Sequence, residues 1–268
     1  MANPAFSTNP AFNGKGVPAI PTPTAEQLQQ QFELPSAPDP VAAAPMTVDG
    51  TVRVSMATFG VLLAGAAVGW ITLPLVPYLW IGAAIVGFVL ALVNMFKREP
   101  SPALILGYAG AQGVFLGGIS SLFEYLYPGI VLQAVLATFC VVAVTLVLFA
   151  SGKVRASARA TKVFLIVMAG YLLFSLVNVG IMIFGGADGN AWGLRGSVEV
   201  FGIPLGVILG VLAVLLGAYS LVLDFDFIQK GVQNGIPKKY QWTGAFGIMV
   251  TIIWLYLEIL RLLAIARR

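Results

Sequence analysis

Histidine is absent from this sequence of 268 residues, and cysteine occurs once, at Cys140. The absence of histidine excludes Ser-His-Asp and Cys-His catalysis, HExxH zinc sites and pH switching by an imidazole. A single cysteine excludes an internal disulfide and a thiolate cluster. Charged residues make up only 10% of the chain, against about a quarter in soluble domains, and 59% of the residues are hydrophobic. A water-soluble enzyme is therefore excluded, and any chemistry must rest on carboxylates, amines and backbone groups.

The first 53 residues differ in composition from the rest. They contain nine of the sixteen prolines and a glutamine-rich stretch, without a sustained apolar period. Such a segment cannot bury enough apolar surface to offset its ordering entropy, so residues 1–53 are expected to form a disordered cytoplasmic tail. The repeats Asn3-Pro4-Ala5-Phe6 and Asn9-Pro10-Ala11-Phe12 are either a docking motif for a membrane-protein partner or low-complexity sequence.

Residues 54–268 contain seven apolar runs, each near the twenty or so helical residues that cross a membrane. The runs cover 55–76, 79–96, 102–123, 130–150, 163–184, 201–228 and 243–264. They do not alternate between polar and apolar residues, which excludes barrel strands. We therefore predict an all-α membrane protein, a bundle of seven transmembrane helices. Glycines spaced about four apart in the first, third and sixth runs predict close helix contacts.

Basic residues gather in the connections on one side of this predicted bundle. Eleven lysines and arginines fall on the side of the N-terminal tail, and three fall on the other, namely Arg195, Arg267 and Arg268. Because cytoplasmic loops carry the excess of basic residues, we expect a cytoplasmic N-terminus and an external C-terminus in the cell (plasma) membrane. The net charge of +4 thus reflects topology and indicates no nucleic-acid binding.

Three carboxylates lie within the apolar runs, where a carboxylate is costly and indicates function. Asp224 and Asp226 are near the cytoplasmic end of the sixth run, and Glu258 lies deep in the seventh. Two positions apart on a helix, the aspartates differ by about 200° in direction, so only one can face the bundle interior. Alternatively, both aspartates end the helix in water, and Glu258 forms a local ion pair with Arg261.

Three stretches in order resemble the Bax inhibitor-1 family. They are Pro128-Gly129-Ile130-Val131-Leu132-Gln133-Ala134, Leu223-Asp224-Phe225-Asp226-Phe227-Ile228, and Leu255-Tyr256-Leu257-Glu258-Ile259-Leu260-Arg261-Leu262-Leu263. The resemblance covers about residues 54–264, and the proline-rich tail looks like that of an actinobacterial branch. It implies a bundle with a central seventh helix and a pH-sensitive calcium leak across the membrane.

The resemblance also implies roles for individual residues. An aspartate of helix six and one of helix seven share a proton in the family; they match Asp224 and Glu258, with glutamate replacing the second aspartate. A basic residue at the end of helix two, Lys97 or Arg98 here, helps to latch the closed state. Arg261 is a further latch candidate through its position beside Glu258.

The predicted mechanism is a leak of cations gated by carboxylates. Two carboxylates in a low-dielectric site resist simultaneous ionisation and titrate as a coupled unit. Because calcium takes six to eight oxygen ligands, Asp224 and Glu258 suit its transient passage and not a tightly bound metal. No cofactor and no enzymatic activity are expected. The alternative is an interaction protein that modulates membrane proteases or stress responses through residues 1–53.

Contact between Asp224 and Glu258 depends on where the seventh helix begins. At 1.5 Å per residue, Asp224 lies about 7–8 Å from the inner end of its helix, and Glu258 lies about 24 Å beyond Trp242. The two carboxylates approach each other only if residues 237–247 run along the membrane interface and are not part of the helix.

Overall fold

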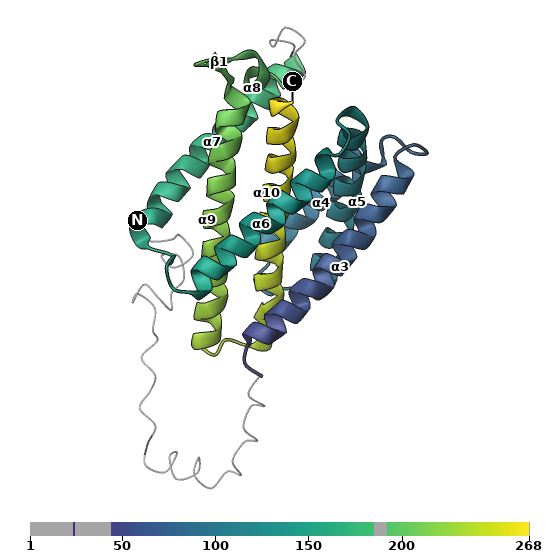
Figure 1. The fold of residues 1–268 in the computed structure, drawn as a ribbon. Coiled ribbons are helices and arrows are strands. Elements are labelled where there is room, and N and C mark those ends of the chain that lie inside the picture. The colour runs from purple at the N-terminus through teal and green to yellow at the C-terminus, as the bar shows by residue number, and fades with distance from the viewer. Residues whose placement is uncertain (1–23, 25–43, 185–191, 268) are drawn as a thin grey trace. The chain divides into compact units, whose positions relative to one another are not determined.

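The computed structural model describes Thr24 and residues 44–184 and 192–267. Most of the predicted tail therefore lies outside the described residues, including the Asn-Pro-Ala-Phe repeats. Seven long helices dominate residues 44–267 (Figure 1), and each is long and apolar enough to cross a membrane. They are α3 (Val48–Thr72), α4 (Leu79–Phe96), α5 (Pro102–Leu126), α6 (Ile130–Ala150), α7 (Ala158–Phe184), α9 (Leu205–Gln233) and α10 (Gln241–Ala266). The predicted all-α bundle of seven spans is confirmed.

Three helices begin at positions that differ from the predicted runs. The first helix begins at Val48, inside the segment assigned to the tail, because the Thr47 side chain accepts a hydrogen bond from the Gly50 N–H and caps it. Helix α7 begins at Ala158, so its first turns include Arg159 and Lys162. Helix α9 begins only at Leu205, four residues later than predicted.

A short connector replaces the predicted start of the sixth span. It consists of α8 (Leu194–Ser197) and an antiparallel hairpin of β1 (Glu199–Val200) and β2 (Ile203–Pro204). The turn residues Phe201 and Gly202 both have positive φ, of 55° and 76°, as a two-residue hairpin turn requires. This connector leads directly into α9 and, as described below, supplies a residue to the candidate site.

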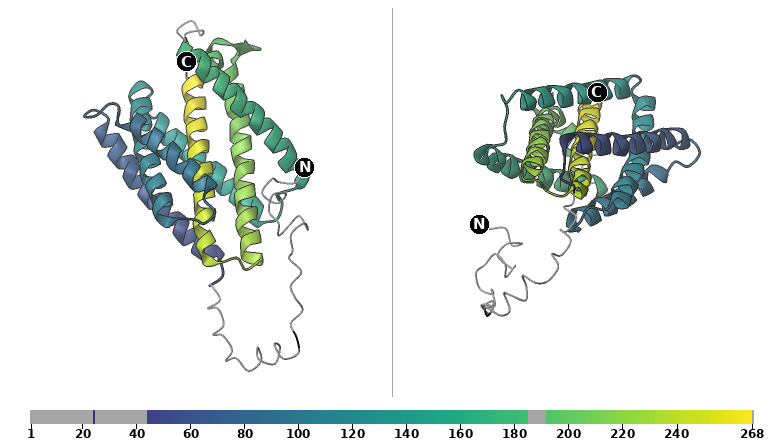
Figure 2. Two further views of the ribbon diagram at one scale, coloured as in Figure 1. Left: turned by 180° about the vertical axis from the view of Figure 1, so that it is seen from behind. Right: turned by 90° about the horizontal axis from the view of Figure 1, so that it is seen from below.

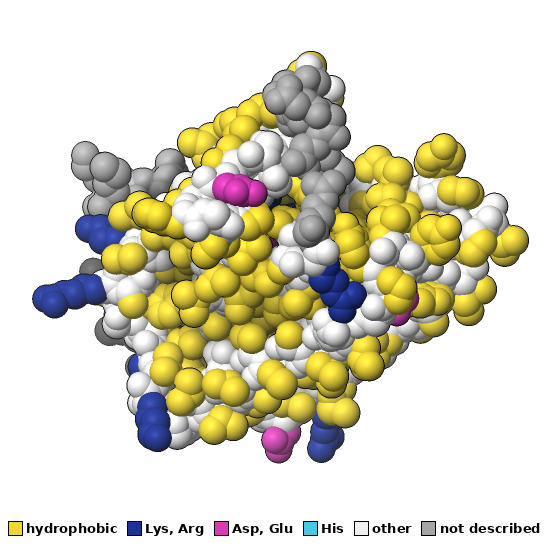
Figure 3. Space-filling view, turned by 45° about the horizontal axis from the view of Figure 1, so that its top comes forward, with side chains coloured by type: hydrophobic (Ala, Val, Ile, Leu, Met, Phe, Trp, Pro, Cys, Tyr) yellow, Lys and Arg dark blue, Asp and Glu magenta, His cyan; other side chains and the backbone are white. Residues whose placement is uncertain are grey.

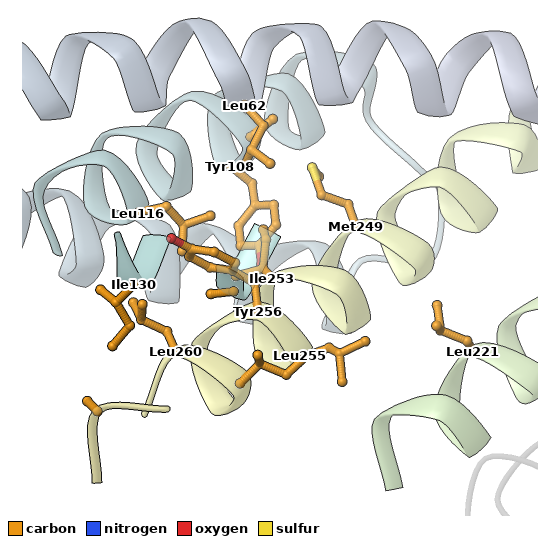
Figure 4. Packing of buried hydrophobic residues seen from close by; sticks show 14 of the residues in the cluster. Leu62, Tyr108, Leu116, Ile130, Leu221, Met249, Ile253, Leu255, Tyr256 and Leu260 are labelled. Carbon is orange, nitrogen blue, oxygen red and sulfur yellow. The ribbon is translucent and has the colours of Figure 1, made fainter. Parts of the chain in front are cut away.

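Helix α10 is the central helix of the bundle, as predicted. It packs against α9, α3 and α6 and runs between them in both views of Figure 2. Its side chains pack with apolar side chains of α3, α5, α6 and α9, several of which are labelled in Figure 4. These buried residues are Leu62 of α3, Tyr108 and Leu116 of α5, Ile130 of α6, Leu221 of α9, and Met249, Ile253, Leu255, Tyr256 and Leu260 of α10.

Helices α3 and α5 cross at very short distance, which confirms the prediction from glycine spacing. A Cβ atom on Gly69 would overlap the carbonyl oxygen of Val114, and one on Gly117 would overlap the carbonyl oxygen of Ala66. The backbones themselves therefore form this contact, which only glycine permits.

Apolar side chains also cover the outside of the bundle. Hydrophobic groups dominate the face shown in Figure 3, and large exposed ones occur on α3, α4, α6, α7 and α9. A water-soluble protein does not expose apolar surface on this scale. Seven spanning helices with this exterior place the protein in a lipid bilayer as a multi-pass membrane protein.

Candidate functional site

One end of the bundle gathers the start of α3 and the connections α4–α5, α6–α7 and α9–α10; we call it the basic end. The backbone N–H of Lys238 donates to the carbonyl of Ala44, and the Lys239 ammonium lies 2.6 Å from the Glu99 carboxylate. These contacts tie the start of α3 and the α4–α5 connection to the α9–α10 connection. The connector with α8 and the C-terminus of α10 lie at the opposite end (Figure 1).

Asp224 faces the central helix from α9. The Thr251 hydroxyl donates a hydrogen bond of 2.7 Å to Oδ2 of Asp224, and the Ser220 hydroxyl lies 3.3 Å from that of Thr251. Gly247 contributes room, since a Cβ there would lie 3.2 Å from Oδ1 of Asp224. A carboxylate and two hydroxyls thus form a small polar group between α9 and α10.

Asp226 lies on another side of α9. Its carboxylate is 2.6 Å from the ammonium of Lys230, one turn further on, and neither side chain is fully buried. The azimuth argument is confirmed, because Asp224 faces α10 and Asp226 pairs along its own helix. The structure does not bring the two aspartates into one site.

Glu258 is buried in the middle of an ion cluster. Its Oε1 accepts a hydrogen bond of 2.8 Å from Arg261, three residues on, so the predicted local pair exists. A second guanidinium, that of Arg195, lies with Nη1 3.5 Å from Oε2. Only 4% of Glu258 is exposed, and two arginines therefore surround one carboxylate inside the bundle.

Arg195 lies in the connection between the fifth and sixth spans, as expected, but its burial was not predicted. The residue is only 3% exposed. Its Nη2 donates to the Tyr171 hydroxyl at 3.0 Å and to the Ser175 hydroxyl at 2.7 Å, and its guanidinium lies 5.1 Å from the centre of the Tyr171 ring. Tyr171 and Ser175, one turn apart within the apolar stretch of α7, were the sequence signal for a buried partner.

The two carboxylates that the family resemblance pairs are separated in this structure. Asp224 meets α10 at Thr251, seven residues before Glu258, which corresponds to about 10 Å along the helix. The condition for contact is not met, because α10 is already helical from Gln241. Between the two levels, the fully buried Leu255 packs onto Gly217 of α9.

Arg261 pairs with an acidic residue, but among the described residues the two predicted latch residues after α4 do not. Lys97 and Arg98 are exposed, and neither forms an ion pair with any residue in the described ranges. Their neighbour Glu99 does, with Lys239. The hydrogen bond from Lys239 holds the pKa of Glu99 below its ordinary value. A link between the α4–α5 connection and the α9–α10 connection therefore exists, but an acidic residue makes it.

Residues 44–184 and 192–267 contain no group of three or more acidic or cysteine side chains that could hold a metal ion. The seam between α9 and α10, which we define by Asp224, Ser220, Thr251, Leu255 and Glu258, instead offers single carboxylates at two levels. One carboxylate attracts a cation without supplying the six to eight oxygens of a calcium site.

Comparisons with known proteins agree with the fold. No relative among curated proteins matches the sequence. A family model described as Bax inhibitor 1 like matches residues 3–268, which is almost the whole chain. Together with seven spans and a central last helix, this match shows that the chain belongs to the Bax inhibitor-1 like family.

Proposed function

We propose that this protein is a pH-sensitive calcium leak of the cell membrane, without enzymatic activity, whose path follows the seam between α9 and α10. The observation that carries the proposal is the position of Asp224, a carboxylate on a spanning helix that faces the central helix α10. Carboxylates at such positions mark ion pathways and proton relays. Protons and cations compete for the same oxygens, which links flux to pH.

The seam has the features of a closed path. From the basic end, a cation first meets the hydroxyls and carboxylate of Ser220, Thr251 and Asp224. Leu255 against Gly217 then forms an apolar barrier. Beyond it, Arg195 and Arg261 outnumber Glu258 and repel cations. Opening therefore requires that α9 and α10 part at Leu255 and that Arg195 releases Glu258.

The orientation forms part of the proposal. Lysines and arginines cluster at the basic end, so we place this end and the N-terminus in the cytoplasm and the C-terminus outside. Cations at the outer side then meet the Arg195–Glu258 cluster, and cytoplasmic protons reach Asp224.

Calcium flux into liposomes containing the full chain tests the mechanism over a range of pH. Asp224→Asn is expected to abolish most of the pH dependence, and Glu258→Gln to alter it by loosening the Arg195 contact. Asp226→Asn is the matched control on the same helix and should behave as the wild type. If the pH dependence of calcium flux is unaltered in both Asp224→Asn and Glu258→Gln, this mechanism is contradicted. Absence of flux, with binding partners lost on deletion of residues 1–50, would favour an interaction protein.

A further inference from the structure

Four basic residues occur within a short stretch of sequence where α6 connects to α7. They are Lys153, Arg155, Arg159 and Lys162, and all four are exposed. None of them forms an ion pair with another residue in the described part of the chain, 44–184 and 192–267. Arg159 and Lys162 are three residues apart on α7 and share one face of the helix. Within residues 44–184 and 192–267, this patch thus carries positive charge without an ion-pair partner.

An apolar cavity, widely open along one side, begins at Arg159 and runs between α7 and α9. Its volume is about 450 Å³. Arg159 stands at one end, and apolar side chains line the rest, including Val163, Val167, Leu212 and Leu215. From Arg159 to Val167 the cavity follows α7 for eight residues, or about 12 Å. That length covers most of one bilayer leaflet, whose hydrocarbon is about 15 Å deep.

Contacts between α7 and α9 hold the end of the cavity near Arg159 in place. The Thr161 hydroxyl lies 3.1 Å from the Tyr219 hydroxyl, and the Phe164 ring packs 5.3 Å from the Tyr219 ring. Arg155 donates to the side-chain oxygen of Gln229 at 2.7 Å, which fixes the connection beside α9. The cavity is therefore built by defined contacts, and further along the two helices Tyr171 of α7 packs with Ala213 and Leu216 of α9 (Figure 1).

We propose that α7 and α9 form a binding site for an anionic phospholipid of the leaflet at the basic end. The headgroup phosphate binds Arg159 and Lys162, and one acyl chain occupies the cavity below them. The arrangement matches an amphiphile, because cations without an ion-pair partner in the described residues lie at the end of an apolar groove within the spanning region. Basic pockets between spanning helices suit anionic headgroups for this reason.

The charges of Arg159 and Lys162 set the expected loss of lipid affinity. A lysine or arginine near an anionic membrane surface contributes about 1 kcal/mol, or about fivefold in affinity. Neutralising Arg159 and Lys162 together should thus weaken binding by about 25-fold. A zwitterionic lipid with the same chains lacks the net negative charge and should bind more weakly to the wild type by a comparable factor.

Native mass spectrometry of the full chain in mild detergent, titrated with phosphatidylglycerol or phosphatidylcholine of identical chains, measures both effects. The double variant Arg159→Gln/Lys162→Gln should lose most phosphatidylglycerol binding. The matched control Lys97→Gln/Arg98→Gln removes two exposed charges at the same end and should lose little. Leu215→Trp fills the cavity from an exposed position, keeps all charges and should weaken both lipids.

Two outcomes overturn the site. Equal losses in the two double variants would mean that the lipid responds only to the total charge of the basic end. Unchanged binding in Leu215→Trp would mean that no acyl chain enters the cavity. Neither outcome depends on calcium flux, so the site can fail independently of the proposed leak.

Discussion

The guanidinium of Arg195 lies 3.5 Å from the carboxylate of Glu258, and each side chain is about 95% buried. One residue belongs to the short helix α8 between α7 and α9, and the other to the central helix α10. The contact therefore fastens the connector between α7 and α9 to the central helix. Because Tyr171 and Ser175 hold the same guanidinium, α7 is drawn into this contact as well.

Removal of the carboxylate in Glu258→Gln should destabilise the protein strongly. The change leaves Arg195 buried without its counter-charge, which costs about 3–5 kcal/mol. Thermal unfolding in detergent measures the effect, and the double variant Arg195→Met/Glu258→Met should recover much of the loss, because the one guanidinium left without Glu258, that of Arg261, is partly exposed. Asp226→Asn removes a partner of the exposed Lys230 and should cost at most about 1 kcal/mol. Equal losses in Glu258→Gln and Asp226→Asn would contradict a structural role for the buried pair.

Thr251→Val should shift the pH dependence of calcium flux. Valine keeps the shape of threonine but cannot donate to Asp224, and a hydrogen bond to a charged group contributes about 1.5–3 kcal/mol. The carboxylate then loses the donor that Thr251 supplies, so the midpoint of the pH dependence of flux should shift away from that of the wild type. Thr251→Ser retains the hydroxyl and should restore the wild-type midpoint. A midpoint that is the same in all three proteins would remove Asp224 from the gate.

The sequence predicted the helices well where composition changes abruptly. The observed bounds of α4 and α6 equal the predicted runs, because the connections on either side contain proline, glycine or charged residues. The start of α9 was missed by four residues, since Phe201 to Pro204 are as apolar as a span but form a turn and strand. Apolar character alone does not distinguish a hairpin strand from a helical turn.

The candidate site was predictable only in part, for a similar reason. Glu258 and Arg261 are neighbours on one helix, so spacing alone predicted their pair. The approach of Arg195 to Glu258 depends on how the connector folds back onto α10, which local sequence does not determine. The separation of Asp224 from Glu258 followed from counting residues along a straight α10. The helical rise per residue therefore predicted the separation of Asp224 and Glu258 correctly. The pairing that the family resemblance implies is not observed in this structure.

Gly69→Ala should disrupt the crossing of α3 and α5. The added Cβ would overlap the carbonyl oxygen of Val114, which belongs to the backbone and can move only with α5. Overpacking of this kind costs about 1–3 kcal/mol. Gly60→Ala is the matched control on the same helix, because nothing lies within 4 Å of a Cβ there. It should be neutral or stabilising by up to about 1 kcal/mol in a helix interior. Thermal unfolding of both variants in detergent compares them, and similar midpoints would contradict the close crossing.

The ion pair of Glu99 with Lys239 should contribute to stability only above acidic pH. The hydrogen bond from Lys239 lowers the pKa of Glu99 below its ordinary value of 4.5 in the folded protein. The contribution is therefore present above pH 4.5 and is lost as the pH falls through the lower folded pKa. Carboxyl carbon NMR of the protein in detergent micelles should show the Glu99 titration returning toward 4.5 in Lys239→Gln and staying low in Lys238→Gln. High salt should weaken the effect, because both groups are exposed and screening reduces their attraction. A Glu99 titration that ignores both Lys239 and salt would show that the two connections are not joined by this contact in solution.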